Sequence, residues 1–546
     1  MTLSTSYFPA DASEPVLELT VGDLLRMRAA DSPDALAVIE LAPPGGPSLA
    51  GADRTDRSWT YAQLHEEAAH CAQWLMQHFA PGDRITVWAP NVPEWVILQY
   101  GAAMAGLILV TANPALRAEE LRFVLSQSRS SGLFHADTFR GTDMTAIARV
   151  AAQDLPTPPV LVNFASWSTK IRGWRGELRE LPAVRPGDPA QIQYTSGTTG
   201  TPKGALLHHR GLVTNARYIA VRGGLAQSGR FASAMPLFHT AGCGMSVLGA
   251  AHLRSALLLV QAFDPALVLH AMAEHRADAF LGVPTMLIAM LNHPDFADVD
   301  LSACQIVMSG GAVVPPELVR RVESSFGCRF STVYGQTELS PIVTQTSPDD
   351  AESDKTESDG KPLWNVEVTI ADPVTGEPVP IGEQGEIRVR GYQQMIEYYD
   401  NPDATATTVD AENWLHTGDL GTMDSRGYLR VTGRLKDMVI RGGENIYPSE
   451  IEQLLFTHPA IEDAAVVGVA DDVWGEQVAA VLRLHEGVAV PTANELRNFC
   501  RKHLAPHKTP TYWYTTAEFP LTGSGKVQKF RIADLIAAQA YDPLSP

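Results

Sequence analysis

The sequence has little of several features that point to particular protein classes. It has five cysteines in 546 residues, and none stand in a Cys-x-x-Cys spacing. That scarcity argues against a disulfide framework or a structural zinc site and fits a reducing compartment. Basic residues are outnumbered, with 42 Lys and Arg against 62 Asp and Glu, so the formal net charge is −20. This charge argues against nonspecific binding to nucleic acid or to an anionic membrane.

Long apolar runs and a secretory signal are also missing. The longest apolar runs, such as 101–110 and 246–251, are shorter than a membrane span requires. The amino-terminal residues carry neither a basic segment nor an apolar core, which are the two parts of a secretory signal. We therefore expect a soluble, cytoplasmic protein with no integral membrane segment and no nucleic-acid partner. The length, with 45% hydrophobic residues, predicts two or more domains.

Strand-like and helical segments alternate through the first part of the chain. A helix is expected at 60–79, because Thr60 and Gln63 form a capping box and the apolar residues fall on one face. Alternation of this kind predicts a parallel α/β sheet. The further elements expected here are strands at 85–89, 107–110, 277–283 and 304–308 and helices from Pro93 and at 118–127, 265–276 and 315–326.

The character of the sequence changes twice after about residue 347. Residues 348–361 are acidic and polar and are expected to form an exposed loop, whereas 366–389 alternates apolar and polar residues as short antiparallel strands do. A domain boundary is expected at Lys436, with residues 1–435 as the larger domain and 436–546 as the smaller one. The elements expected beyond it are helices 449–456 and 493–504, the second capped by Thr492 and Glu495, and strands 464–469 and 478–484.

The most informative segment is 194–204, which reads Tyr-Thr-Ser-Gly-Thr-Thr-Gly-Thr-Pro-Lys-Gly between two strand-like runs. Its glycines let the backbone approach a ligand, its hydroxyls add donors and its lysine adds positive charge, so it suits a polyphosphate. Its spacing differs from that of a P-loop, which opens a helix and has a hydroxyl after the lysine. A flexible linker is the simpler alternative. The expected phosphate contacts are Thr195, Ser196, Gly197, Thr198, Thr199, Gly200 and Lys203.

Four later segments also carry residue types suited to a nucleotide site. Residues 334–338, Tyr-Gly-Gln-Thr-Glu, offer a ring for a base, a hydroxyl for phosphate and a carboxylate for a hard cation. Asp419 can accept hydrogen bonds from ribose hydroxyls, and Arg434 offers a rigid fork of donors. Residues 520–529 place two glycines beside a lysine, and 436–448 include a glycine pair. Seen alone, each segment could be an ordinary turn, hairpin or surface loop.

Together, in this order and near these spacings, the five segments resemble the motifs of the adenylate-forming superfamily. That superfamily includes acyl- and aryl-CoA synthetases, beetle luciferases and peptide-synthetase adenylation domains. The resemblance covers about residues 190–530 and is greatest to medium-chain acyl-CoA synthetases. It implies an α/β fold with a large N-terminal domain of α/β sheets plus a small β-barrel, and a small, mobile α+β C-terminal domain. It also implies ATP, Mg²⁺ and CoA as cofactors and a small carboxylic acid as the substrate.

The resemblance implies a role for individual residues of this chain. Tyr334 would stack on adenine, Thr337 would contact the α-phosphate and Glu338 would help to hold Mg²⁺ together with the ATP phosphates. Lys526 would be the catalytic cation and Lys436 the hinge. The resemblance also places His239 beside the carboxylate and implies that the residues contacting ATP or AMP include Gly311, Ala312, Gly335, Asp419 and Arg434. It implies a CoA tunnel formed by Arg441, Gly442 and Gly443. It implies an acyl pocket lined by His239, Val283, Gly310 and Gly335, whose walls also include 280–284 and 309–312.

The implied reaction has two half-reactions. A carboxylate attacks ATP at the α-phosphorus and gives an acyl-adenylate and pyrophosphate, and a thiol then displaces AMP to give a thioester. Residues 437–546 would turn about Lys436 between the two steps. Amino-acid-activating relatives carry Phe-Asp where this chain has Phe238-His239, so an amino-acid substrate is not expected.

Small and apolar pocket residues favour a hydrophobic acid, either a medium-chain fatty acid or a bulky ring acid. Three other functions stay open: an enzyme that loads a carrier protein, a luciferase-like oxygenase and a nucleotide-binding scaffold. A homodimer also stays open.

Overall fold

The computed structural model describes residues 2–41, 57–195, 202–442, 444–471, 473–521 and 527–545. The chain divides into two compact units. The main unit consists of residues 9–367 and 390–415, and the C-terminal unit consists of residues 1–8, 368–389 and 416–546. The boundary expected at Lys436 stays a prediction.

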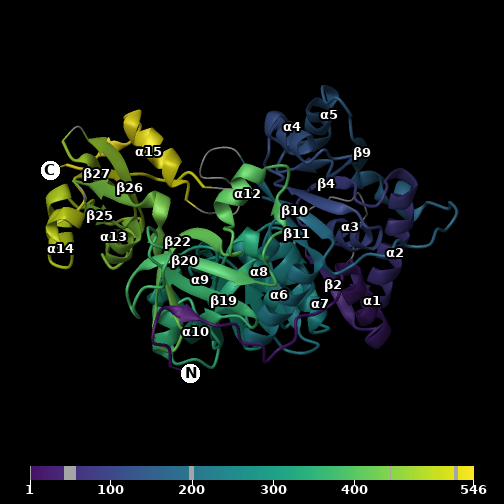
Figure 1. Ribbon diagram of the computed structural model, residues 1–546, viewed down its shortest axis with the longest axis horizontal. Helices are drawn as coiled ribbons and strands as arrows, with labels where there is room; N and C mark the ends of the chain where they lie inside the picture. The colour runs from purple at the N-terminus through teal and green to yellow at the C-terminus, as the bar shows by residue number, and fades with distance from the viewer. Residues whose placement is uncertain are drawn as a thin grey trace. The chain divides into compact units, whose positions relative to one another are not determined.

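One sheet of the main unit has seven strands in the order β21-β11-β10-β5-β4-β6-β9 (Figure 1). Neighbouring strands from β10 to β9 run parallel, whereas β11 and β21 are antiparallel at one edge. The antiparallel pair β10–β11 confirms the prediction that the threonine-glycine segment lies between two strands. The bounds are β21 Glu397–Tyr398, β11 Lys203–His208, β10 Pro189–Thr195, β5 Ile108–Ala112, β4 Arg84–Trp88, β6 Gly132–His135 and β9 Val160–Asn163.

The second sheet of the main unit has nine strands in the order β18-β17-β16-β15-β14-β12-β13-β2-β3. Its six central strands are parallel, and β17, β18 and β3 are antiparallel. The predicted parallel α/β architecture is therefore confirmed. The bounds are β18 Lys361–Pro362, β17 Ile342–Gln345, β16 Arg329–Gly335, β15 Ile306–Gly310, β14 Ala279–Leu281, β12 Arg230–Ser233, β13 Ala256–Val260, β2 Leu36–Leu41 and β3 Ser58–Thr60, with a small separate pair β7 Thr138–Phe139 and β8 Thr142–Asp143.

Helix α2 of the main unit begins where the capping box predicts. The Gln63 N–H donates to Thr60 Oγ1 and the Thr60 N–H donates to Gln63 Oε1, so the predicted capping box starts α2. Helix α3 is buried along its whole length, as suits a helix that is apolar on every side. The bounds are α1 Val21–Asp31, α2 Tyr61–His78, α3 Pro93–Met104, α4 Ala118–Gln127, α5 Met144–Gln153, α6 His209–Arg222, α7 Gly249–His252, α8 Pro265–Glu274, α9 Pro284–Leu291, α10 Pro316–Phe326, α11 Glu352–Glu357 and α12 Pro402–Thr408.

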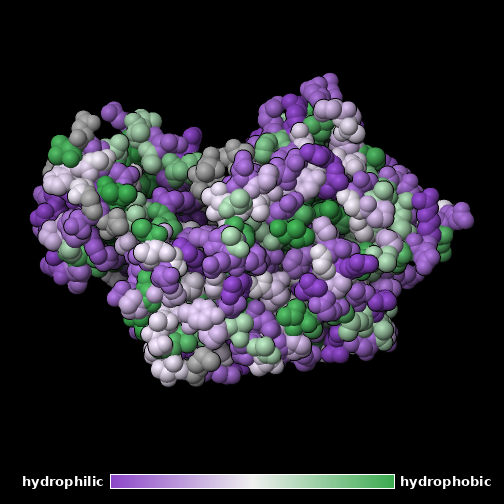
Figure 2. Space-filling model, in the orientation of Figure 1, coloured by the Kyte–Doolittle hydropathy of each residue, from purple (hydrophilic) through white to green (hydrophobic). Residues whose placement is uncertain are grey.

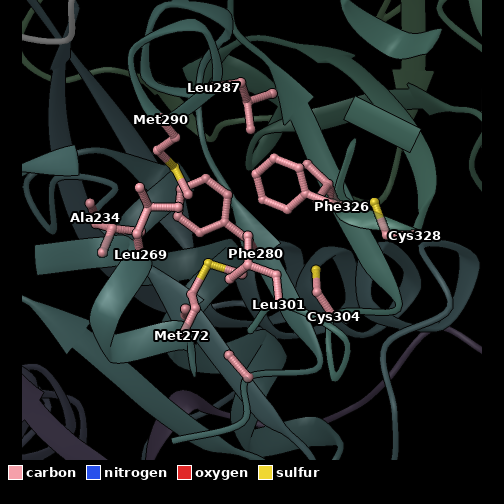
Figure 3. Packing of buried hydrophobic residues seen from close by; sticks show 14 of the residues in the cluster. Ala234, Leu269, Met272, Phe280, Leu287, Met290, Leu301, Cys304, Phe326 and Cys328 are labelled. Atoms are coloured by element: carbon pink, nitrogen blue, oxygen red, sulfur yellow. The ribbon is translucent and has the colours of Figure 1, made fainter. Parts of the chain in front are cut away.

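A large apolar cluster fills the space between the nine-stranded sheet and the helices that cover one of its faces. Phe280 lies among Leu269, Met290 and Phe326 in this cluster and has no exposed surface (Figure 3). Burial of such a side chain contributes about 1.5–3 kcal/mol. Phe280 is therefore a core residue, and its expected place in an acyl-pocket wall stays a prediction.

The chain's cysteines are all buried. Cys304 and Cys328 belong to the apolar cluster of Figure 3. All five cysteines are free thiols and are buried: Cys71, Cys243, Cys304, Cys328 and Cys500.

The prediction of an exposed loop at 348–361 is partly wrong. Helix α11 occupies Glu352–Glu357, and its residues 354–356 are buried. Lys355 can be buried because its ammonium group pairs with Glu323 on α10 at 2.5 Å. Polar composition indicated a loop, but a charge partner on a neighbouring helix decided the structure.

The C-terminal unit contains most of a five-stranded sheet in the order β1-β19-β20-β22-β23. Strand β19 and most of β20 lie in 366–389, where short strands were predicted, whereas β1, β22 and β23 lie outside that range. The bounds are β1 Tyr7–Phe8, β19 Val366–Ala371, β20 Gly385–Gly391, β22 Leu415–Met423 and β23 Leu429–Arg434.

The rest of the C-terminal unit is a six-stranded sheet with three helices. Strand β27 pairs with β24, β26 and β28, and Figure 1 shows β26 beside β27. The predicted Thr492–Glu495 capping box starts α14, whereas β28 and α15 were not predicted. The bounds are β24 Val439–Arg441, β25 Glu444–Ile446, α13 Pro448–Leu455, β26 Ile461–Asp471, β27 Gly475–Leu484, α14 Ala493–Arg501, β28 Tyr512–Thr515, α15 Lys529–Ala537 and β29 Asp542–Pro543.

The surface is largely polar on the face that Figure 2 shows, and hydrophobic residues form small groups between hydrophilic ones. Within the described ranges, no helix has both the length and the apolar character needed to cross a membrane.

Candidate nucleotide and acyl site

Several of the predicted site residues lie at one edge of the nine-stranded sheet. Strands β12, β14, β15 and β16 are parallel neighbours. Gly310 and Gly335 are the last residues of β15 and β16, while Val283 and His239 lie in the loops that follow β14 and β12. Because the carboxyl ends of parallel strands meet at the same edge, the fold gathers these residues there. In open α/β sheets, this edge is where ligands bind.

The loop that carries His239 is fixed by a buried asparagine. Asn91 Oδ1 accepts from the Leu237 N–H at 2.8 Å, and Asn91 Nδ2 donates to the Met235 carbonyl at 3.0 Å. His239 is partly buried beside the ring of Phe238 and lies just before the π-helix η3, Ala241–Leu248. π-Helical turns are frequent at functional sites because they widen the helix locally.

Gly310 and Gly335 have a packing role that sequence reasoning missed. A Cβ atom at Gly310 would lie 2.1 Å from the Val333 carbonyl oxygen, and one at Gly335 would lie 2.0 Å from that of Pro341. No side chain can be accommodated at either position without a backbone shift. The glycines allow neighbouring backbones to approach closely, and their role in an acyl pocket stays a prediction. Gly311, with a φ of +78°, and the exposed Ala312 follow directly after Gly310.

A short segment of the main unit joins the two predicted phosphate-binding regions. The Ile396 and Tyr399 N–H groups donate to carbonyls of β11, Leu206 and Gly204, each at 2.8 Å. The Met395 N–H donates to the Glu338 carbonyl, also at 2.8 Å. Residues 395–399 therefore bind the strand that begins at Lys203 and the turn that carries Glu338 at the same time. Thr195 lies opposite Lys203 in the β10–β11 pair.

Tyr398 lies between Lys203 and Glu338. Its hydroxyl donates to Glu338 Oε1 at 2.5 Å, and the Lys203 ammonium lies 5.1 Å from the centre of its ring. Tyr398 and Glu338 are 5% and 8% exposed, respectively. Burial, and then the neighbouring Glu338 carboxylate, raise the pKa of the Tyr398 hydroxyl above its ordinary value. The hydroxyl therefore remains protonated at neutral pH and acts as the donor.

Glu338 suits a magnesium ion that is shared with a ligand. Within the described residues, no group of three or more His, Cys, Asp or Glu side chains is placed to hold a metal by itself. Magnesium is commonly bound by one or two carboxylates together with substrate phosphates. A single carboxylate beside a lysine-bearing strand therefore fits a metal that arrives with ATP.

In the C-terminal unit, Asp419 and Arg434 face each other across β22 and β23. Arg434 Nε lies 2.9 Å from Asp419 Oδ1, and the aspartate side chain is 6% exposed whereas that of the arginine is 47% exposed. The Asp419 N–H also donates to Thr417 Oγ1, which donates in turn to the Ile387 carbonyl. The carboxylate is thus held in place, as binding of a ribose would require.

The predicted hinge and tunnel residues lie further along the C-terminal unit. Lys436 is exposed in a 3₁₀ turn, η6 Leu435–Asp437. Gly442 forms the turn of the β24–β25 hairpin with a φ of +60°, and a Cβ atom there would lie 2.7 Å from the Trp474 ring. The Arg441 guanidinium lies 5.6 Å from the centre of that ring and donates to the His507 carbonyl. The hairpin was the simpler alternative for this segment, and its role in a tunnel stays a prediction.

Some predicted residues fall outside the part of the chain that the structure describes. They are Ser196, Gly197, Thr198, Thr199, Gly200, Gly443 and Lys526.

Sequence reasoning missed Tyr398 and Trp474. Tyr398 stands in Met-Ile-Glu-Tyr-Tyr, which contains no recognisable motif, and its partner Glu338 is 60 residues away. The weak available signal for Trp474 was an aromatic residue directly before a glycine, Gly475.

Two family models match the chain. The model described as AMP-binding enzyme matches residues 25–399, and the AMP-binding enzyme C-terminal domain matches residues 450–526. The first match spans more than half of the chain, so the protein belongs to the family of AMP-binding, adenylate-forming enzymes. The family predicted from the motifs is confirmed.

Individual relatives resemble the chain over nearly its whole length. It is 38% identical over 547 residues to "Putative acyl-CoA synthetase YngI" of Bacillus subtilis (strain 168), covering 95% of this chain and 97% of that protein. It is 32% identical to "Medium-chain acyl-CoA ligase ACSF2, mitochondrial" of Danio rerio, covering 98% and 91%. Among solved structures, o-succinylbenzoate CoA synthetase (MenE) of Bacillus subtilis, in complex with the acyl-adenylate intermediate OSB-AMP, matches with a TM-score of 0.80 and 28% identity, covering 94% and 98%.

Proposed function

We propose that the protein activates a hydrophobic carboxylic acid of medium chain length with ATP and transfers the acyl group to CoA. The enzyme is an AMP-forming acid–CoA ligase, which forms an acyl-adenylate first and a thioester second. The observation that carries the proposal is the joining of β11 and the Glu338 turn by residues 395–399. That joining puts a lysine and a lone carboxylate in one place, as binding of a metal–polyphosphate requires.

In the first step, the substrate carboxylate attacks the α-phosphorus and pyrophosphate leaves. Lys203 and the segment 195–203 bind the phosphates, Thr337 contacts the α-phosphate and Tyr334 covers the adenine face. Glu338 and the ATP phosphates would hold a magnesium ion, which neutralises phosphate charge. Lys526 brings a second cation to the reacting phosphate, where negative charge builds up; removing one such group typically costs a factor of about 10²–10³ in rate.

In the second step, the CoA thiol attacks the acyl carbon and AMP leaves. A rotation of residues 437–546 about Lys436 removes the lysine loop and presents Gly442 and Gly443 to the pantetheine chain. His239 lies beside the acyl carboxylate. Asp419 and Arg434 bind the ribose or phosphate through both steps.

The substrate class follows from pocket composition and from the relatives. The ACSF2 proteins are named medium-chain acyl-CoA ligases. For this chain, Val283, Gly310 and Gly335 supply a small, apolar wall beside His239. A bulky ring acid is the second candidate substrate, because small residues in the acyl pocket would also leave room for a wide group.

The test is exchange of labelled pyrophosphate into ATP over a panel of acids, from acetate to long chains and to terpenoid and aryl acids. We expect exchange to be strongest with medium-chain acids and to be lost in the Lys526→Ala variant. Failure of the wild-type protein to exchange pyrophosphate with every acid would overturn the proposal.

A second assay separates the alternative functions. With the best acid, we expect CoA to consume the adenylate and a phosphopantetheinylated carrier protein to be a poor acceptor. The reverse order would indicate a carrier-loading enzyme, and light emission with a luciferin would indicate an oxygenase. ATP binding without exchange would indicate a scaffold.

The proposal includes a cytoplasmic location, which the acidic net charge and the five unpaired cysteines support. The homodimer stays an open alternative, and a mass measurement in solution would decide between a monomer and a dimer.

A further inference from the structure

Tyr398 lies between the Lys203 ammonium and the Glu338 carboxylate, whose direct ion pair would compete with their binding of phosphate and metal. It belongs to β21, where it pairs with Ala205 of the antiparallel strand β11. This register puts its ring beside Lys203, which begins the same strand. A cation over an aromatic face is attracted by the ring and gains about 0.5–2 kcal/mol, depending on how far it is desolvated.

The hydroxyl end of the same side chain fixes the carboxylate. Tyr398 donates to Glu338 Oε1, and within the described residues no other hydrogen bond to the Glu338 carboxylate is found. The Glu338 carbonyl accepts from the Met395 N–H, so backbone and side chain of the turn are both fixed by the segment 395–399. One carboxylate oxygen is engaged, and the other is left for a ligand.

The electrostatic alternative to this arrangement is a direct ion pair. Opposite unit charges about 4 Å apart attract each other by about 4 kcal/mol where the effective dielectric constant is near 20. A Lys203–Glu338 pair would withdraw the cation from the phosphates and the anion from the metal. Tyr398 contacts both groups instead, Lys203 through its ring face and Glu338 through its hydroxyl.

We propose that Tyr398 is a positioning residue that keeps Lys203 and Glu338 apart and directs each toward a different part of a metal-bound polyphosphate. The inference rests on the proposed function, because it assigns phosphate to Lys203 and metal to Glu338. It predicts that Tyr398 contributes to binding of ATP with magnesium and contributes nothing to binding of AMP, which requires neither the metal nor the β- and γ-phosphates.

The test uses two variants of the full-length protein and calorimetric titrations with three ligands: ATP with magnesium, ATP without magnesium and AMP. Tyr398→Phe keeps the ring but removes the hydroxyl, and we expect its Kd for magnesium–ATP to rise about 10- to 100-fold, as loss of one hydrogen bond to a charged group predicts. Tyr398→Leu also removes the aromatic face and should weaken magnesium–ATP binding further. In both variants the Kd for AMP should stay within about two-fold of the wild-type value. The control is Tyr512→Phe, at an exposed tyrosine of β28, which should leave all three affinities unaltered.

A double-mutant cycle keeps the test decisive if Tyr398→Leu is poorly folded. In a Glu338→Gln background, Tyr398→Phe should have no further effect on magnesium–ATP binding, because its hydroxyl acts through the carboxylate. Additive effects, equal losses for AMP and magnesium–ATP, or no loss with Tyr398→Phe would each overturn the inference. Failure of the proposed function looks different, since the wild-type protein would then neither bind ATP nor exchange pyrophosphate.

Discussion

Lys529 and Glu452 form an ion pair, Nζ to Oε1 at 2.7 Å, at the first residue of α15. The same Glu452 oxygen accepts from the Val466 N–H on β26. The Gln528 N–H donates to the Pro520 carbonyl, and Leu521 bridges to Val527. These contacts join residues 520–521 to 527–528 and attach the start of α15 to α13.

Glu452→Gln should slow adenylation and leave thioesterification intact. The lysine and glutamate side chains are 23% and 13% exposed, so the pair is only partly screened by solvent. A loss of about 1 kcal/mol corresponds to about a five-fold fall in rate. The two half-reactions are measured separately, by pyrophosphate release and by transfer from a supplied acyl-adenylate to CoA.

Glu450→Gln is the matched control, because it breaks the Lys508–Glu450 pair on the same helix α13. Equal damage to adenylation in the two variants would show that the effect comes from a weakened helix and not from the lysine segment.

Lys526→Ala should remove most adenylation activity, by a factor of about 10²–10³, because the developing phosphoryl charge loses its second cation. Transfer from a supplied acyl-adenylate to CoA should continue. Lys502→Ala, at an exposed lysine after α14, is the control. Loss of the transfer step as well would contradict the assigned role. Acetylation of Lys526 should imitate the alanine variant because it removes the charge.

Lys436→Pro should spare adenylation and stall thioesterification. Proline fixes φ near −65° and removes the backbone N–H, so it restricts rotation at this position. Single-turnover measurements of each half-reaction check this, with Lys436→Ala as a control that keeps backbone freedom. Equal damage to both steps by the proline variant would argue against a hinge at Lys436.

Asp419→Asn should weaken AMP and ATP binding alike. The carboxylate, which is paired with Arg434, loses its charge, and a hydrogen bond to a charged group contributes about 1.5–3 kcal/mol, or about 10- to 100-fold in Kd. Titration with AMP measures the effect, and Asp534→Asn on the exposed face of α15 is the control. An unchanged AMP affinity would remove Asp419 from the nucleotide site.

Asp463→Asn should stabilise the protein, and more so at higher pH. Burial raises the pKa of Asp463 to about 6, although Arg483 at 3.6 Å opposes the shift. The pKa of Asp463 in the folded protein lies above its unfolded value of about 3.9. The contribution of this carboxyl to folding stability is therefore fully present below the unfolded pKa and is lost as the pH rises through 6.

The increase in the free energy of unfolding caused by Asp463→Asn should therefore be roughly half as large at pH 5 as at pH 8. At pH 8 it should be at most about 3 kcal/mol. Thermal unfolding midpoints at the two pH values check this. A gain that does not depend on pH would mean that Asp463 does not titrate in this range.

The sequence predicted the elements whose signals are local. The helix at 118–127 matches α4, and the capping boxes at Thr60 and Thr492 both form, because a cap depends on residues three positions apart. The threonine-glycine segment was correctly placed between strands, since apolar runs on both sides define them. Family motifs supplied the candidate site, which composition alone would not.

What the sequence did not reveal depends on contacts between distant segments. Helix α11 is stabilised by the Lys355–Glu323 pair, and Phe280 is buried by helices that precede and follow it in the chain. Tyr398 acquires its place from pairing with β11 and from Glu338. None of these partners can be inferred from spacing along one chain, so pattern and propensity were insufficient.

The burial of every native cysteine has a practical consequence. A maleimide dye reacts with exposed thiolates, and the native thiols at 71, 243, 304, 328 and 500 are all sheltered inside folded cores. A pair of cysteines introduced on the surface, one on each side of residue 436, would accept fluorophores without removal of a single wild-type sulfur. A change in energy transfer between them during turnover would then report the rotation predicted about residue 436 in an otherwise unaltered enzyme.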